Sequence, residues 1–174
     1  MKKVDPSNPN VRIPSEEDSH QNLLRGELYR EAFDRIGMGL KDERYFEVIA
    51  LSDNIITDRV QSLIQDIIRD EPEEYSWMSV GAAIEVLFRE VKTRKITLDK
   101  TLKKNLSEAH GVWSQKRNSA SHGFVVITPK NVDMGLDERL ENVRDAAEQG
   151  ASLARKITNQ IDKFRRDTRL IPKD

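Results

Sequence analysis

Apolar residues recur at a helical spacing along most of this chain, and this periodicity predicts a protein built from helices. Between residues 42 and 70, apolar positions repeat about every 3.6 residues, which is the period of one helix face. This stripe comprises Tyr45, Val48, Ile49, Ser52, Ile56, Val60, Leu63, Ile64 and Ile67. Comparable stripes predict further helices over residues 23–36, 80–93, 98–122 and 137–164.

Several residues indicate where these helices begin and end. Gly37 and Gly39 follow the first stripe and predict its end, because glycine commonly terminates helices. Thr97 is the expected N-cap of the fourth helix, with Asp99 in the first turn, and Gly123 ends that helix. Residues 124–129 are β-prone. Since no second run of this kind could pair with them, we expect an extended connector or a small hairpin there.

The links between the stripes predict an all-α fold, a bundle of four to five antiparallel helices. The chain has 174 residues, which is enough for one domain with its own core. Residues 1–22 contain three prolines and no periodicity, so we expect a flexible N-terminal arm. The helical domain would span residues 23–166, and residues 167–174 would form a tail.

The composition excludes several kinds of chemistry. The chain has no cysteine, so it has no disulfide, thiolate metal site or cysteine nucleophile. Its three histidines, His20, His110 and His122, lack clustered acidic neighbours, and we expect neither a metal ion nor a cofactor. No apolar stretch follows the first lysines and none is long enough to span a membrane, so we expect a cytoplasmic protein without membrane contact.

Positive charge is concentrated in one part of the sequence. Residues 89–117 contain nine Lys or Arg and three Asp or Glu, although the net charge of the whole chain is −1. A local basic face can bind phosphates without a high overall pI. The same run is equally consistent with a solvated helix face.

A short motif stands at the end of this basic stretch. Arg117 and Asn118 are followed by His122 and then by Gly123, where the fourth predicted helix stops. Arginine stays cationic at every working pH, whereas histidine changes charge near neutrality. This pair suits chemistry on a phosphodiester, because one group holds negative charge and the other moves a proton.

This motif, the order of the helices and the following glycine together resemble the HEPN family. The similarity covers most of residues 42–165. Residues 45–53 resemble the earlier core helix of the family, and residues 98–123 resemble the helix that leads into its motif. The resemblance implies a HEPN-like bundle. Many members are metal-independent endoribonucleases, commonly toxins or defence effectors, and they usually form homodimers in which two motifs face one cleft.

The resemblance also implies roles for the residues of the motif. Arg117 would bind and polarise the scissile phosphate of RNA. His122 would move the proton between the ribose 2′-hydroxyl, the phosphate and the leaving 5′-oxygen, giving a 2′,3′-cyclic phosphate and a 5′-hydroxyl. Asn118 lies four residues before His122 and on the same helix face, so it would orient the imidazole or the phosphate.

Some HEPN proteins add an acidic residue from the earlier core helix, and Asp53 is the candidate here. It falls on an apolar stripe, where a carboxylate is costly to bury unless it is paired, and Arg117 is the expected partner. Asp58 is the weaker choice. Phe124 stands where some toxins carry a tyrosine that nucleotidyltransferase antitoxins modify, so this mode of silencing is not expected, although another antitoxin or regulatory protein could bind.

Each functional interpretation has a structural alternative. His122 could cap a helix end, and an Arg117–Asp53 pair could fix helix register without catalysis. Trp113 could stack on a base, but a tryptophan on an apolar stripe is more often a core residue. The alternatives to a ribonuclease are a non-catalytic helical binding or regulatory module, of which the mannitol operon repressor family is an example, and an immunity partner.

Overall fold

The computed structural model describes residues 16–68 and 78–168, and every regular element within these ranges is a helix. The elements are α1 (Glu16–Lys41), α2 (Tyr45–Ile68), α3 (Val80–Thr93), α4 (Lys100–Glu108), the π-helical turn η1 (Ala109–Trp113), α5 (Ser114–Gly123) and α6 (Leu136–Asp167). The expected all-α bundle is therefore confirmed for the described residues. None of their helices could cross a membrane, since none is both long and apolar enough.

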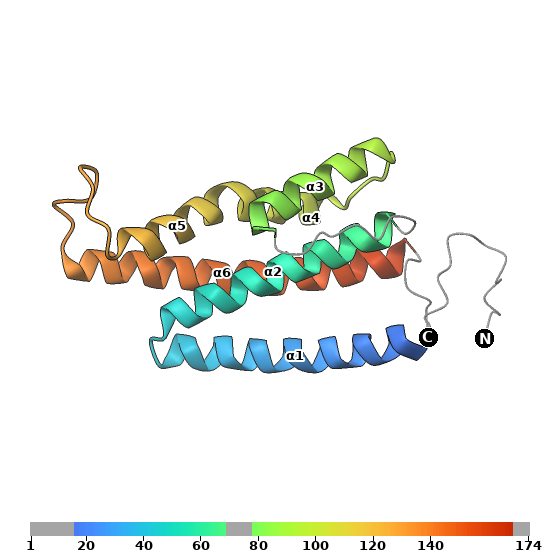
Figure 1. Ribbon diagram of the computed structural model, residues 1–174, viewed down its shortest axis with the longest axis horizontal. Helices are drawn as coiled ribbons and strands as arrows, with labels where there is room; N and C mark the ends of the chain where they lie inside the picture. The colour runs from blue at the N-terminus through green and yellow to red at the C-terminus, as the bar shows by residue number, and fades with distance from the viewer. Residues whose placement is uncertain (1–15, 69–77, 169–174) are drawn as a thin grey trace.

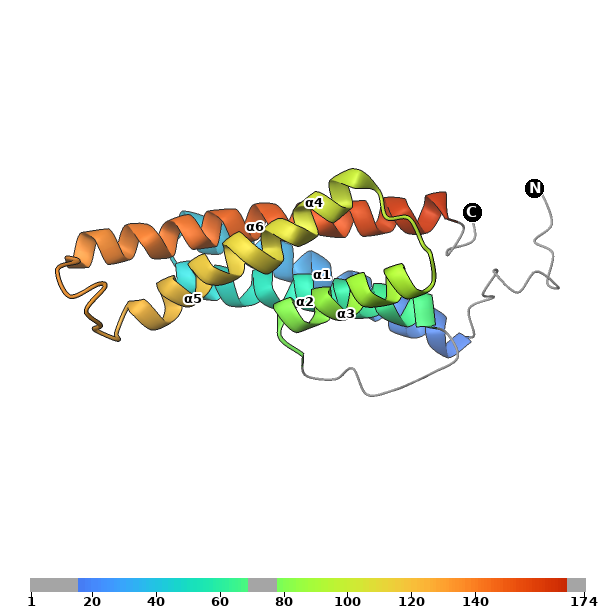
Figure 2. The same ribbon diagram turned by 90° about the horizontal axis from the view of Figure 1, so that it is seen from above.

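α4, η1 and α5 follow one another without interruption and form one long rod (Figures 1 and 2). Within η1 the helix widens by a π turn, and the Ser114 hydroxyl donates a hydrogen bond of 2.7 Å to the Ala109 carbonyl oxygen. α6 lies alongside the rod, and residues 124–135 connect the two at one end. The opposite end of the rod follows α3 through residues 94–99.

α2 and α6 lie side by side at the centre of the bundle and run in the same direction (Figure 1). The contacts between the two helices agree with this direction. Arg59 of α2 pairs with Asp162 of α6, and further along both helices Ser62 accepts a hydrogen bond from Arg165. α1 with α2, and α5 with α6, are antiparallel as expected. The expectation was wrong for α2 and α6, because α3 runs in the same direction as both, and between α2 and α6 only the rod runs the opposite way.

The core fills the space between α2, α3, the rod and α6. Its largest fully buried side chains are Trp113, Ile56, Leu63, Ile64, Ile84, Leu87, Leu102, Leu106, Leu153, Ile157 and Ile161. α1 packs on the outer side of α2 and contributes one buried apolar residue among those described, Ile36. The stripes predicted for the second and fourth helices, which are α2 and the rod, therefore face the core. The opposite side of the rod faces outward.

Several expected boundaries at α1 were wrong. α1 begins at Glu16, so residues 16–22 are helical rather than part of a flexible arm, and residues 1–15 lie outside the described residues. The helix continues through Gly37 and Gly39 to Lys41. A Cβ atom at Gly39 would lie 2.7 Å from Val48 Cγ2, so this glycine allows α1 and α2 to approach closely instead of ending the helix.

The start of α4 also differs from the expectation. Asp99, not Thr97, is the N-cap, and its carboxylate accepts hydrogen bonds from the amides of Thr101 at 2.9 Å and Leu102 at 3.2 Å. These bonds, led by the one from Leu102, lower the pKa of the Asp99 carboxyl. Residues 124–129 form a connector without a strand, one of the two expected alternatives. Of the expected tail, residues 169–174 lie outside the described residues.

Candidate functional site

The packing of Trp113 fixes the rod one turn before the motif. Its indole is fully buried, and Nε1 donates a hydrogen bond of 3.0 Å to the carbonyl oxygen of Ala146 on α6. Gly150 faces the ring, where a Cβ atom would lie only 2.8 Å from Cζ2. Trp113 is therefore a core residue, and because the helix is anchored there, the next residue on the same stripe, Arg117, has a fixed starting position.

Arg117 joins the rod to α2 through Asp53. Its Nη1 donates to Asp53 Oδ1, and its guanidinium lies 5.7 Å from the centre of the Trp113 ring. Nε and Nη2 donate to Asn118 Oδ1 at 3.2 and 2.9 Å. The ion pair expected from the sequence is therefore present, and Asn118 orients Arg117 rather than His122.

This ion pair is neither fully buried nor fully exposed. The side chain of Arg117 is 18% exposed and that of Asp53 is 27% exposed. A guanidinium has five N–H groups, and the contacts with Asp53 and Asn118 use three of them. Two N–H groups remain for an anion that approaches from solvent, which is the arrangement a phosphate-binding arginine needs.

His122 lies apart from Arg117 within one protomer. Five residues of an α-helix correspond to a turn of about 500°, so the two side chains leave the helix about 140° apart. His122 is exposed, and among the described residues its imidazole has no hydrogen-bond partner. Its backbone carbonyl accepts a hydrogen bond of 2.9 Å from the Val126 amide. The structure thus groups Arg117, Asp53 and Asn118 and leaves His122 on the neighbouring open face.

Arg139 and Asn131 brace the end of α5, a role that no pattern in the sequence indicates. Arg139 is buried and donates to the carbonyl oxygens of Gly123, Asn131 (2.7 Å) and Met134 (3.1 Å). The Asn131 amide donates to the Val126 carbonyl oxygen at 2.9 Å, and its oxygen accepts from the Thr128 amide at 2.6 Å. These bonds hold the last carbonyl groups of α5, and therefore the helix turn that carries His122.

Apolar side chains are exposed around this braced end. They are Val125 (74%), Val126 (49%), Ile127 (70%), Val132 (58%), Leu136 (64%) and Leu140 (41%). Phe124 packs edge-on against Phe46 of α2, with ring centres 5.2 Å apart. Such a concentration of exposed apolar residues is unusual for a surface that faces only water. We call these six residues the apolar end of the rod.

The remaining candidates lie elsewhere. The Tyr29 hydroxyl donates to Asp58, and Arg25 lies 3.4 Å from the same carboxylate, so Asp58 belongs to the α1–α2 contact. His110 lies on η1, 3.0 Å from Glu85 Oε1 on α3. Among the side chains that the structure describes, those of residues 23–68 and 78–168, no group of three or more His, Asp or Glu is placed to hold a metal ion.

Comparison with protein-family models, with curated proteins and with solved structures gave no significant match to this chain. The HEPN interpretation therefore depends on the motif and on the order of the helices.

Proposed function

We propose that this protein is a metal-independent endoribonuclease of the HEPN type that acts as a homodimer. The observation that carries the proposal is the partly exposed Arg117 guanidinium, which Asp53 and Asn118 hold in place with two N–H groups unused. An exposed imidazole, His122, follows on the same helix. A fixed cation and a titratable group on one helix suit cleavage of a phosphodiester without a metal ion, because the cation stabilises the negative charge that develops on the phosphoryl oxygens.

The proposed reaction needs two proton transfers. The ribose 2′-oxygen attacks phosphorus and loses its proton to one imidazole. The bond from phosphorus to the 5′-oxygen breaks, and that oxygen gains a proton from a second imidazole. The products are a 2′,3′-cyclic phosphate and a 5′-hydroxyl. Because the attacking and leaving oxygens lie on opposite sides of phosphorus, a single His122 cannot serve both, and a second copy of the chain supplies the other.

The apolar end supports a dimer of this kind. Three of its side chains, Val125, Ile127 and Leu136, are each more than 60% exposed, and all three follow His122 closely in the chain. A second copy packed on this surface would cover them and bring two motifs together. By resemblance, the protein would act as a toxin or defence effector in the cytoplasm, and an antitoxin or regulatory protein would restrain it.

The test is cleavage of a long single-stranded RNA by the purified protein in the presence of EDTA. We expect His122→Ala to lower the cleavage rate by about 10²–10⁴-fold, the usual contribution of a general acid or base. His110→Ala is the matched control, since it removes a histidine of the same rod that contacts Glu85 instead. Cleavage that persists unchanged in His122→Ala, with folding and oligomeric state intact, overturns the proposal.

A non-catalytic helical binding or regulatory module is the second candidate. The observation in its favour is that three of the five N–H groups of Arg117 are already bonded within the protomer, as in a purely structural ion pair. In this case neither Arg117 nor His122 substitutions would change any cleavage rate. Arg117→Gln would lower only the free energy of unfolding.

A further inference from the structure

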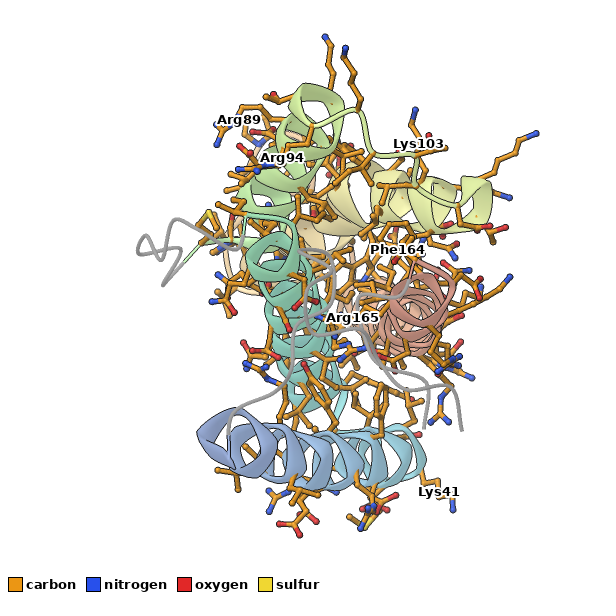
Figure 3. All side chains as sticks on the ribbon, turned by 90° about the vertical axis from the view of Figure 1, so that its right-hand side faces the viewer. Lys41, Arg89, Arg94, Lys103, Phe164 and Arg165 are labelled. Atoms are coloured by element: carbon orange, nitrogen blue, oxygen red, sulfur yellow. The ribbon has the colours of Figure 1, made fainter. Side chains whose placement is uncertain are left out.

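Unpaired lysines gather at the end of the bundle opposite to the motif. Residues 92–104 contain six Lys or Arg and one acid, and all six basic side chains are exposed. They are Lys92, Arg94, Lys95, Lys100, Lys103 and Lys104, which we call the basic end. Figure 2 shows that α3 passes into α4 here, at the far end of the rod from the end of α5. Figure 3 views this end directly, with Arg94 just after α3 and Lys103 on α4.

The acidic residues nearby leave these charges uncompensated. The Asp99 carboxylate caps α4, and Glu90 lies 3.6 Å from Arg94 and 3.3 Å from Arg89. Among the described residues, the five lysines of the basic end make no ion pair or hydrogen bond through their side chains. Among the described lysines elsewhere, Lys116 pairs with Asp145 at 3.1 Å, whereas Lys41, Lys130, Lys156 and Lys163 have no partner, so what distinguishes the basic end is the number of charges gathered there. The basic end therefore keeps a net positive charge that is available to a ligand.

Lys95 also occupies an unusual backbone position. Its φ is +55°, in the left-handed region, and the Ile96 amide after it donates a hydrogen bond of 2.9 Å to the Val91 carbonyl oxygen. Glycine is the residue that this position at a helix end favours. A lysine thus supplies a charge at a place where its backbone conformation is unfavourable. Lys95→Gly is consequently a way to remove one charge without weakening the fold.

We propose that the basic end binds the sugar–phosphate backbone of a polynucleotide. Lysine ammonium groups are compact charges that contact phosphates without reading sequence. A membrane surface fits less well, since peripheral membrane binding combines basic residues with apolar side chains that insert between lipids. No large apolar residue of 89–108 is exposed, and the apolar end lies at the other end of the rod.

The separation of the two ends sets a length for the ligand; this step rests on the proposed ribonuclease function. Lys100 and His122 are 22 residues apart on the rod, which corresponds to about 33 Å at 1.5 Å per residue. At about 3.4 Å per stacked nucleotide, this distance equals about ten nucleotides. A stacked RNA shorter than this does not reach from the basic end to the motif of one protomer, so we expect cleavage of such an RNA not to depend on the basic end.

Binding can be measured separately from cleavage by using full-length protein with His122→Ala. The probe is a 24-nucleotide single-stranded RNA, and the readout is its fluorescence anisotropy. Lys103→Gln with Lys104→Gln removes two charges from the basic end. We expect about 25-fold weaker binding at 0.1 M salt and a salt slope smaller by about 1.4, because each phosphate contact on a single strand contributes about 0.7 to the slope. Lys95→Gly should weaken binding about fivefold by the same rule.

The matched control is Lys41→Gln with Lys156→Gln, which removes the same net charge from exposed positions on α1 and α6. Equal weakening by both double variants overturns the proposal, since net charge alone would then explain it. No weakening by the basic-end variants overturns it as well. So does a dependence on these lysines for binding vesicles of phosphatidylserine and phosphatidylcholine but not for binding RNA. Loss of RNA binding by the basic-end variants supports it even if the protein never cleaves RNA.

Discussion

Several arginine–aspartate pairs connect α2 to its neighbours, and two of them, Arg165–Asp66 and Arg117–Asp53, differ in what surrounds them. Arg165 of α6 donates to Asp66 at 2.6 Å and to the Ser62 hydroxyl at 2.7 Å, and its side chain is only 8% exposed. Figure 3 shows Arg165 between α2 and α6. Arg117 donates to Asp53, but its side chain is 18% exposed and it adjoins the exposed Asn118. The two carboxylates are similarly exposed, but the guanidinium of the first pair is enclosed by protein and that of the second opens to solvent; we call them the enclosed pair and the open pair.

The enclosed pair also has a charged neighbour. Arg59 is buried, pairs with Asp162, and lies 5.3 Å from the centre of the Tyr29 ring. Burial, and then the positive charge of Arg165, lower the pKa of the Arg59 guanidinium. Burial of an arginine is therefore no sign of function in this protein, because the two most buried arginines on α2 and α6 only hold helices together. What sets Arg117 apart is its access to solvent.

The largest effect should come from breaking the enclosed pair. Arg165→Met leaves Asp66 without its cation and Ser62 without its donor, so we expect the free energy of unfolding to fall by about 3 kcal/mol. This is the low end of the usual range because Asp66 is 24% exposed and can regain some water. Urea unfolding followed by circular dichroism measures the change.

The double variant Arg165→Met with Asp66→Leu is the control. Replacing both charges by apolar side chains of similar size should recover most of the lost stability. A loss below about 1 kcal/mol for Arg165→Met alone would contradict the enclosed character of this pair, since such a value is typical of exposed pairs.

The next largest effect tests whether the packing of Trp113 positions Arg117 of the open pair. Gly150→Ala places a Cβ atom 2.8 Å from Trp113 Cζ2 and 2.9 Å from Nε1, so the indole must move. We expect a net destabilisation of about 1–2 kcal/mol, because crowding of a packed core outweighs the better helix propensity of alanine. The chain has one other tryptophan, Trp77, and in a Trp77→Phe background a shifted emission maximum of Trp113 would report the displacement that also moves Arg117.

Gly37→Ala is the matched control for this substitution. Gly37 is also inside a helix, but a Cβ atom there has nothing within 4 Å. It should raise the free energy of unfolding by up to about 1 kcal/mol and leave the Trp113 emission unchanged. Destabilisation by both glycine substitutions would mean that helix propensity, and not the Trp113 contact, explains the Gly150 result.

The helices themselves could be predicted from the sequence because apolar stripes report burial directly. The stripe of α2 and the start of α3 at Val80 agree with the structure. The errors arose where a residue has two physical uses. Glycine is a helix terminator and also a means of close packing, and Gly39 serves the second purpose against Val48. The parallel course of α2 and α6 could not be predicted, since it depends on the direction of α3.

The candidate site was predictable only in part. A carboxylate on the stripe of α2 and an arginine on the stripe of the rod predicted the Asp53–Arg117 pair, because each charge needs the other when buried. The brace by Arg139 and Asn131 was missed, because contacts with backbone carbonyl groups across a loop leave no pattern in the sequence. The same pairing logic failed to single out Arg59 and Arg165, because neither residue belongs to the apolar stripe predicted for its helix.

A double-mutant cycle would compare the open pair with the enclosed one. We expect a coupling energy of about 1 kcal/mol between Arg117→Gln and Asp53→Asn, because both side chains are partly solvated. The same cycle on Arg165 and Asp66 should give a clearly larger value. The Arg117–Asp53 coupling should also shrink in 1 M salt, where charges are screened over about 3 Å. Equal couplings for the two pairs would show that the distinction between them has no energetic basis.

The smallest effect concerns Tyr29, whose ring covers Arg59 on the enclosed side. Burial, and then the hydrogen bond to Asp58, raise the pKa of the Tyr29 phenol above its ordinary value. Below about pH 10 this contribution to stability is complete, and it is lost as pH rises further, because the Tyr29 phenol of the unfolded chain ionises first.

Tyr29→Phe should lower the free energy of unfolding by about 0.5 kcal/mol at pH 7, since Asp58 is 41% exposed. Above pH 10 the wild type should lose stability more steeply than Tyr29→Phe, as urea unfolding at pH 9 to 11 would measure. If the free energy of unfolding of both proteins falls equally with pH, water reaches the Tyr29 phenol. The contact between α1 and α2 is then as accessible to solvent as the Arg117–Asp53 pair.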